Sequence, residues 1–238
     1  IELGSLYAAA GELEEAEQAF GTAADLEPTN YDAQFGHADV LRRLTRLVEA
    51  ARAYLRALAI NRNAAEAHKG LATVYIELGE YEQALQFARE AVEIEPSDGE
   101  SRANLGAAHS FLRQHEQAVA QYDAAAELLD LTPDLLLNWG SSLGALNRHR
   151  EMVTVLDRAR ELAAGSGLQA TVLERLGFAH FKLGAFAEAQ RSFQRAIDAD
   201  PRHYPALNGL AVVLLNDYID GGEQDDALRL QAAGLLRR

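Results

Sequence analysis

The sequence predicts an all-α fold, an α-solenoid of antiparallel helix pairs, and three observations lead to this prediction. Alanine (45) and leucine (36), two strong helix formers, make up about a third of the 238 residues, whereas β-branched residues are sparse. Pro28 and Pro96 lie 68 residues apart, twice 34, and Pro201 follows 105 residues later, close to three times 34. Small residues recur with the same period. A period of 34 residues indicates a helix–turn–helix repeat that packs only against its neighbours.

The period divides residues 1–238, taken as a single array, into seven repeats. The expected repeats are residues 1–30 (truncated at the start), 31–64, 65–98, 99–132, 133–169, 170–203 and 204–238. The fifth repeat carries a three-residue insertion at residues 167–169. The seventh has a polar segment from Asp217 to Asp226, which predicts a long loop. If Ala227 then stands at position 20, the sequence ends inside the second helix of this repeat and leaves an apolar face open.

Within each repeat, two helices are expected to cross closely, because small residues occupy the crossing positions. With Ala65 as position 1, position 8 is Gly4, Ala38, Ala72, Gly106, Gly140, Gly177 and Ala211. Position 20 is Ala16, Ala50, Ala84, Ala118, Met152 and Ala189, and position 27 is Ala23, Ala57, Ala91, Ala125, Ala159 and Ala196. Bulky residues at position 24 should fill the space between the helices: Phe20, Tyr54, Tyr122, Leu156 and Phe193, with Ala88 as the exception.

Glycine and proline predict where the helices end. Gly11, Gly79 and Gly184 stand at position 15, where a left-handed residue would end the first helix. Proline at position 32 cannot continue the second helix, so it separates one repeat from the next.

These positions resemble the tetratricopeptide repeat, a family of helix pairs that stack into a right-handed superhelix. The third repeat matches the family pattern with Leu71, Ala72, Tyr75, Gly79, Tyr81, Ala84, Ala91 and Pro96. The sixth repeat matches it with Leu176, Gly177, Gly184, Phe186, Ala189, Phe193, Ala196 and Pro201. The resemblance covers the whole chain and implies a protein-interaction module whose first helices line a concave groove.

Charge and composition exclude several kinds of function. The net charge of −14 repels the phosphates of nucleic acids, and no stretch is apolar enough to insert into a membrane. There is no Cys, no phosphate-binding glycine motif and no pair of His at helical ligand spacing, so we expect no catalytic residue, no metal and no cofactor. The chain begins with Ile1, which predicts that the native N-terminus is missing. A cytoplasmic location is slightly favoured.

The resemblance places positions 2, 5, 6, 9, 12 and 13 in the groove. Asn104 and Asn138, both at position 6, resemble the start of the asparagine ladder that holds peptide backbones in the repeats of O-linked N-acetylglucosamine transferase. Apolar groove residues in the later repeats would anchor a partner, unless Phe178 and Phe181 instead pack against the adjacent repeat. The predicted groove residues are Lys69, Asn104, Phe111, Leu137, Asn138, Arg175, Phe178, Phe181 and Leu215.

Three functions fit these residues. The first is a non-enzymatic scaffold that binds a segment of a partner protein in the groove. An acidic rim of Asp32, Asp39, Glu66, Glu100 and Asp134 favours a basic or neutral partner. The second is the repeat portion of a larger enzyme, such as a glycosyltransferase or sulfotransferase, with its catalytic domain outside this sequence. The third is a scaffold that self-associates through its open ends.

Overall fold

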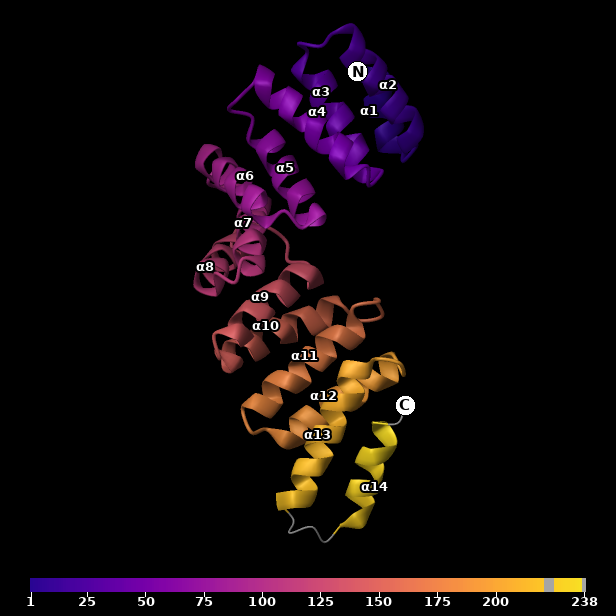
Figure 1. Cartoon of the computed structure of the whole chain (residues 1–238), viewed down its shortest axis with the longest axis vertical. Coiled ribbons are helices and arrows are strands. Elements are labelled where there is room, and N and C mark those ends of the chain that lie inside the picture. Colours follow the sequence, from indigo (N-terminus) through magenta and orange to yellow (C-terminus); the bar gives the residue numbers. More distant parts are fainter. Residues whose placement is uncertain (221–224, 237–238) are drawn as a thin grey trace. The chain divides into compact units, whose positions relative to one another are not determined.

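The polypeptide forms two compact units of paired helices (Figure 1). The computed structural model describes residues 1–220 and 225–236, and the described residues form helices and turns without a strand. We call residues 1–129 unit 1 and residues 130–238 unit 2. The predicted all-α fold is confirmed.

Unit 1 contains four helix pairs. They are α1 (Glu2–Ala10) and α2 (Leu13–Leu26), α3 (Tyr31–Arg43) and α4 (Leu47–Ile60), α5 (Ala65–Leu78) and α6 (Tyr81–Ile94), and α7 (Gly99–Phe111) and α8 (His115–Ala126). Pro28 and Pro96 each lie two residues beyond the end of a second helix, as their inability to continue a helix requires.

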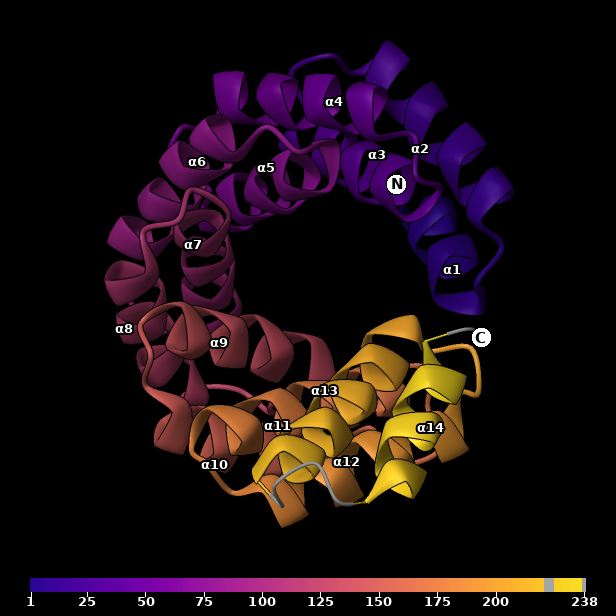
Figure 2. The same cartoon turned by 60° about the horizontal axis from the view of Figure 1, so that its bottom comes forward.

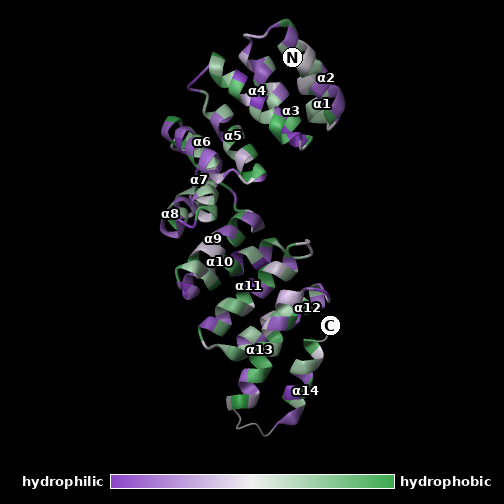
Figure 3. Ribbon diagram, in the orientation of Figure 1, coloured by the Kyte–Doolittle hydropathy of each residue, from purple (hydrophilic) through white to green (hydrophobic). Residues whose placement is uncertain are grey.

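Unit 2 contains three helix pairs. They are α9 (Pro133–Ala145) and α10 (His149–Leu162), α11 (Gln169–Lys182) and α12 (Phe186–Ala199), and α13 (Tyr204–Asp220) and α14 (Asp226–Leu235). In both units the helices carry hydrophobic and hydrophilic residues in alternation along the ribbon, as amphipathic helices of a thin, layered fold do (Figure 3).

Each unit has an inner and an outer layer of helices. Every odd-numbered helix packs against the even-numbered helix that follows it. Within a unit, each even-numbered helix also packs against the next odd-numbered helix. Within each unit, successive odd-numbered helices also contact one another, whereas successive even-numbered helices make no such contact among the described residues. Figure 2 shows α3, α5 and α7 on the inner side of unit 1 and α4, α6 and α8 outside them. We call the exposed surface of the odd-numbered helices the inner face.

The small-residue positions pack as the sequence predicts. All six residues at position 20 are buried, and five of the six at position 27 are completely buried, with Ala23 half-buried. The rings and side chains at position 24 are at most 5% exposed. Close helix crossings therefore depend on alanine and glycine, and single bulky side chains fill the space between the helices.

Position 15 adopts the left-handed conformation in the first six repeats, also where glycine is absent. The backbone φ is 82° at Gly11, 77° at Gly79 and 74° at Gly184, as expected. It is 57° at Thr45, 61° at Arg113 and 58° at Asn147. The turn between the helices therefore imposes this conformation on residues that adopt it at a cost.

The seventh repeat differs from the prediction. The loop expected from Asp217 is wrong at its start, because α13 continues through Asp217 to Asp220. The remainder of that loop, Gly221 to Gln224, lies outside the described residues, as do Arg237 and Arg238. Ala227 is exposed, unlike every other residue assigned to position 20, and instead Leu228, Ala232 and Leu235 pack against the core. The apolar face of α14 therefore begins one residue later than predicted.

Candidate functional site

The predicted groove residues are divided between the two units. Lys69, Asn104 and Phe111 belong to unit 1, and the other six belong to unit 2. The chain therefore has two inner faces, one on each unit, and a partner can use only those side chains that the fold leaves available.

Lys69 on α5 is engaged by the following helix pair. Its Nζ lies 3.1 Å from Oδ2 of Asp98 and 3.0 Å from Oε2 of Glu100. Burial, which would lower the pKa of Lys69, is outweighed by the hydrogen bonds to Glu100 and Asp98, so the pKa is raised above its usual value. These ion pairs join α5 to the start of α7, and a partner would have to compete with two carboxylates for this ammonium group.

Asn104 on α7 is also engaged. Its Nδ2 donates a hydrogen bond of 2.9 Å to Oγ1 of Thr73 on α5, so its amide links two neighbouring inner helices. The side chain is half-buried, and its Oδ1 accepts no hydrogen bond from any residue that the structure describes. The Oδ1 of Asn104 therefore remains available as an acceptor for a partner, whereas its Nδ2 already donates a hydrogen bond within the fold.

A complementary pattern at position 6 explains why asparagine fits there. A Cβ on Gly36 would lie 2.3 Å from Cε1 of Phe20, and one on Gly70 would lie 2.4 Å from Cζ of Tyr54. Gly209 stands in the same relation to Phe193, at 2.4 Å from Cε1.

At position 6, glycine thus makes room for the aromatic ring that the preceding repeat has at position 24 in three cases. Asn138, which follows Tyr122, is the exception. The repeat before Asn104 has Ala88 at position 24, and the missing ring leaves room for a longer side chain at position 6. The sequence held this signal in the pairing of positions 24 and 6, and sequence analysis missed it.

Phe111 at the end of α7 is a partly exposed aromatic surface. Its ring stacks on Tyr81, with centroids 4.5 Å apart and an interplanar angle of 9°. The residue is nevertheless 45% exposed. One face of the ring is therefore used by the fold, and much of the remaining surface is open to solvent.

Asn138 and Leu137 on α9 form the start of the inner face of unit 2. Both residues are half-buried. The side-chain amide of Asn138 forms no hydrogen bond with any other residue that the structure describes. An amide can donate to and accept from a peptide main chain of any sequence, so Asn138 is better placed than Asn104 to hold a partner's backbone.

Arg175 and Glu174 place opposite charges on α11. The Nε of Arg175 lies 3.4 Å from Oε2 of Glu174, and the side chains are 48% and 12% exposed respectively. Burial raises the pKa of Glu174 above its usual value, and the nearby charges of Arg175 and His203 only partly oppose this shift. Arg175 is the exposed member of the pair and the one within reach of a partner.

Phe178, Phe181 and Leu215 belong partly to the core. All three are half-buried and pack against the buried cluster around Phe193 and Leu210. The Phe178 ring also lies edge-on to His149, with centroids 6.3 Å apart, and 5.4 Å from Nζ of Lys182. Part of the surface of Phe178 and Phe181 therefore packs against the adjacent repeat, which was the alternative prediction for these residues. The rest of each side chain is exposed.

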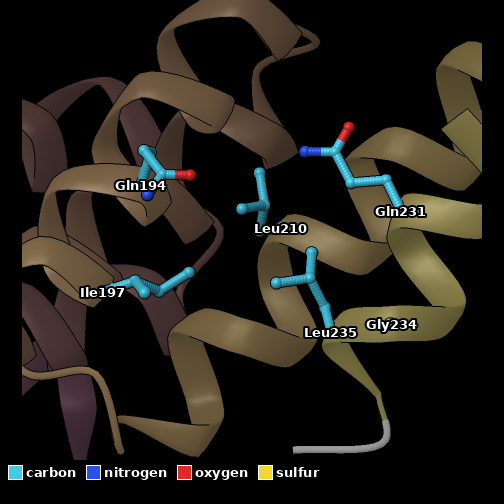
Figure 4. A pocket seen from close by; sticks show the side chains of 6 residues that line it. All are labelled: Gln194, Ile197, Leu210, Gln231, Gly234 and Leu235. Carbon is cyan, nitrogen blue, oxygen red and sulfur yellow. The ribbon is translucent and has the colours of Figure 1, made fainter.

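Three cavities lie between helices or on the outer layer of a unit. One of about 400 Å³ lies between α12, α13 and α14, with Gln194 and Gln231 on opposite sides and Ile197, Leu210 and Leu235 lining it (Figure 4). Two others, of about 370 and 350 Å³, lie between successive outer helices, α4 and α6 in unit 1 and α10 and α12 in unit 2.

The histidines and the longest helices bear on metal binding and membrane insertion. No group of three or more His, Asp or Glu among the described residues is arranged to hold a metal ion. His109 on α7 is buried, with Nδ1 2.6 Å from Oε1 of Gln114. Within residues 1–220 and 225–236, no helix has the length and apolarity needed to cross a membrane.

These features define a class of protein: an α-solenoid built from antiparallel helix pairs, with partly exposed polar and aromatic side chains on the inner faces. Tetratricopeptide repeat families match residues 1–65, 65–98 and 170–203. The chain belongs to the tetratricopeptide repeat family. Members of this family are typically non-catalytic repeat modules.

Several solved structures share the fold. The pilF protein of Pseudomonas aeruginosa superposes with a TM-score of 0.71 at 21% identity, covering 86% of this chain and 92% of pilF. A tetratricopeptide repeat protein of Parabacteroides merdae superposes with a TM-score of 0.68 at 18% identity, covering 99% of this chain and 97% of that protein.

YrrB, described as a protein with an unusual peptide-binding site, superposes with a TM-score of 0.68 at 22% identity, covering 80% of this chain and 97% of YrrB. No curated protein matches the sequence. Identities this low establish the fold alone.

Proposed function

We propose that the chain is a non-catalytic scaffold that binds an extended or helical segment of a partner protein on its inner faces. The observation that carries the proposal is the inner face of unit 2. There the Asn138 amide has no hydrogen-bond partner among the described residues, and Leu137 and Phe178 are only half-buried. An amide that binds main chain beside apolar anchors suits a peptide ligand. The peptide-binding site named for YrrB supports this type of ligand.

In this proposal the nine groove residues have unequal roles. Asn138 would hold the partner's main chain, and Leu137, Phe178, Phe181 and Leu215 would contact its apolar side chains. Arg175 would contact a carbonyl or carboxylate. In unit 1, Phe111 and the free Oδ1 of Asn104 would contribute, whereas Lys69 would mainly maintain the joint between α5 and α7.

The charge of unit 1 favours a basic or neutral partner segment there. Residues 1–129 contain 10 Lys and Arg against 22 Asp and Glu, a net charge of −12. In the acidic rim, Glu100 is paired with Lys69 and Asp39 with Arg42, while Asp32 and Glu66 are exposed. Association with unit 1 should therefore weaken as salt screens these charges.

The test is a selection of peptides from a random displayed library on the whole chain. The affinity of a selected peptide is then measured for Asn138→Ala, for Phe178→Leu and for the double variant that combines them. Leucine at position 178 keeps an apolar side chain in the core. Loss of an anchor typically costs 2 kcal/mol or more, so the double variant should bind about thirtyfold more weakly. Leu162→Ala, on the exposed end of α10, is the control and should bind normally. Unchanged affinity in the folded double variant would exclude the inner face of unit 2.

We also propose weak self-association through the two ends of the chain as a second function. It rests on exposed apolar side chains at both ends, with Leu6 68% exposed on α1 and Leu230 66% exposed on α14. Light scattering over a range of concentrations tests this proposal. A constant monomer mass would exclude it without affecting the first one.

A further inference from the structure

A cleft on the outer layer of unit 2 collects basic side chains from three helices. It has a volume of about 350 Å³ and lies between α10 and α12, with α11 beside them. It is lined by Arg160 of α10, His180 of α11, and Glu188, Arg191, Ser192 and Arg195 of α12. We call it the arginine cleft. None of the nine predicted groove residues lines it.

Two of the three guanidinium groups are held in position by neighbours on their own helices. The Nη2 of Arg160 lies 3.2 Å from Oδ1 of Asp157, and Nη2 of Arg191 lies 2.8 Å from Oε1 of Glu188. The Nε of Arg191 also donates a hydrogen bond of 3.2 Å to the main-chain oxygen of Ala187. A guanidinium group has five N–H donors, so each of these arginines keeps several for a ligand. Prior positioning lowers the entropy lost on binding.

Arg195 is the unmatched charge of the cleft. It lies one helical turn after Arg191 on the same side of α12, and it forms no ion pair or hydrogen bond with any residue that the structure describes. Glu188 is the single carboxylate among the lining residues, and it is occupied by Arg191. The half-buried His180 adds a ring nitrogen that can donate a hydrogen bond. The cleft therefore has an excess of positive charge in a protein whose net charge is −14.

The corresponding cleft of unit 1 has the opposite character. It lies between α4 and α6 and has a volume of about 370 Å³. Its lining includes Glu90 and Glu93 of α6 and one arginine, Arg62, whereas the arginine cleft has three arginines and one carboxylate. One of these carboxylates already has a partner, since Oε2 of Glu90 lies 3.0 Å from Nδ1 of His68. The excess of arginine is thus a property of one cleft and not of every gap between outer helices.

We propose that the arginine cleft binds an acidic segment of a partner protein through its oxyanion groups, either carboxylates of Asp and Glu or a phosphorylated side chain. Arginine forms paired, charge-assisted hydrogen bonds with the two oxygens of a carboxylate or phosphate group, which lysine does not match in geometry. Arg191 and Arg195 bind adjacent oxyanions along the segment, and Arg160 contacts the segment from the opposite wall. The site goes beyond the proposed function of the inner face and does not depend on it.

The test measures fluorescence anisotropy of three labelled peptides on the whole chain at low salt. One peptide is rich in Glu, one carries phosphoserine in place of Glu, and one carries Lys. We expect the first two to bind and the Lys peptide not to bind, and the tighter of the two identifies the preferred oxyanion. Failure of both anionic peptides to bind, or equal binding of the Lys peptide, overturns the proposal.

Two matched variants separate the cleft from the general charge of unit 2. Arg191→Glu/Arg195→Glu should weaken binding of the better peptide by about tenfold or more. Arg158→Glu/Arg202→Glu changes the net charge equally at exposed arginines outside the cleft, and it should change affinity less than about twofold.

Arg191→Lys/Arg195→Lys keeps the charge and the fold, and it should give an intermediate loss. Equal weakening by both charge reversals, or no loss in either the Glu or the Lys variant of the cleft, overturns the proposal.

Discussion

Units 1 and 2 are built from the same helix pairs but present different surfaces. Unit 1 has a net charge of −12, whereas unit 2, with 12 Lys and Arg against 14 Asp and Glu, has −2. The clefts between their outer helices follow the same trend, with Glu90 and Glu93 in unit 1 and Arg191 and Arg195 in unit 2. Their cores, in contrast, follow one pattern, with mostly small residues at the crossing positions and, except for Ala88, a bulky side chain at position 24.

The comparison shows which positions the fold constrains. A side chain that must fit between crossing helices has few alternatives, because a packed interior tolerates neither gaps nor extra volume. A side chain on an outer helix is solvated and can change charge at little cost to stability. Differences between repeats of one array are therefore informative about binding mainly where they lie on the surface.

The largest expected effect tests whether the two cores are equivalent and separate. Phe193→Ala in unit 2 and Tyr54→Ala in unit 1 each remove a ring that is at most 3% exposed, and each should cost about 3–5 kcal/mol of unfolding free energy. Coupling in repeat proteins is mainly between neighbours, so hydrogen exchange should rise chiefly in the unit that carries the substitution. Equal loss of protection in both units would show that they unfold together.

The next effect concerns the pairing of positions 24 and 6. Gly70→Ala in unit 1 and Gly209→Ala in unit 2 each place a Cβ 2.4 Å from a ring atom, and each should cost about 1–3 kcal/mol through overpacking. Asn104→Ala, at the same position but next to Ala88, loses one hydrogen bond to Thr73 and should cost only about 1 kcal/mol. Urea denaturation measures all three. A larger cost for Asn104→Ala than for Gly70→Ala would refute the pairing.

A smaller effect, of opposite sign, is expected at position 15. Thr45 in unit 1 is β-branched and has a φ of 57°, so Thr45→Gly should stabilise the protein by about 1 kcal/mol. Asn147 in unit 2 has a φ of 58°, but asparagine tolerates this conformation, so Asn147→Gly should have little effect. Thermal unfolding of the two variants decides between these expectations, and a gain for Asn147→Gly alone would contradict them.

The smallest expected effect is a difference between the two units in how their stability depends on pH. Burial would raise the pKa of Asp98 in unit 1, but hydrogen bonds from Ser101 and Lys69 outweigh burial and hold this pKa below its usual value. Its contribution to stability is therefore present above the usual Asp pKa and lost as the pH falls through the lowered one. Asp98→Asn, which keeps an amide cap on α7, should make unit 1 less sensitive to acid.

The pKa of Glu174 in unit 2 is shifted in the opposite direction from that of Asp98. Its pKa is raised by burial, so its contribution favours the folded state below the usual Glu pKa and is lost as the pH rises through the raised one. Glu174→Gln should therefore stabilise unit 2 slightly at neutral pH, and the gain should disappear near about pH 4. Hydrogen exchange at the two pH values, compared between units, measures this. A variant that is less stable than the natural sequence at neutral pH would contradict the expected sign.

The sequence alone determined the architecture of this protein, because each repeat forms from contacts within about 34 residues. Small residues at positions 8, 20 and 27 and proline at position 32 specified the helix pairs and their ends. Local signals failed in the seventh repeat, where α13 continues to Asp220 and Leu228 rather than Ala227 packs against the core. Nothing in a polar segment indicates whether a preceding helix will continue through it.

Only the tertiary structure decided which surface side chains are available to a partner. Asn104 and Asn138 occupy the same repeat position, yet the amide of Asn104 donates to Thr73, 31 residues earlier, while that of Asn138 has no such bond among the described residues. Arg160 meets Arg191 and Arg195 in one cleft because the outer helices α10 and α12, which make no direct contact, both line it. Hydrogen bonds and ion pairs act over a few ångströms in space, so a repeat position in the sequence predicts the layer that a residue joins but not the groups that it meets there.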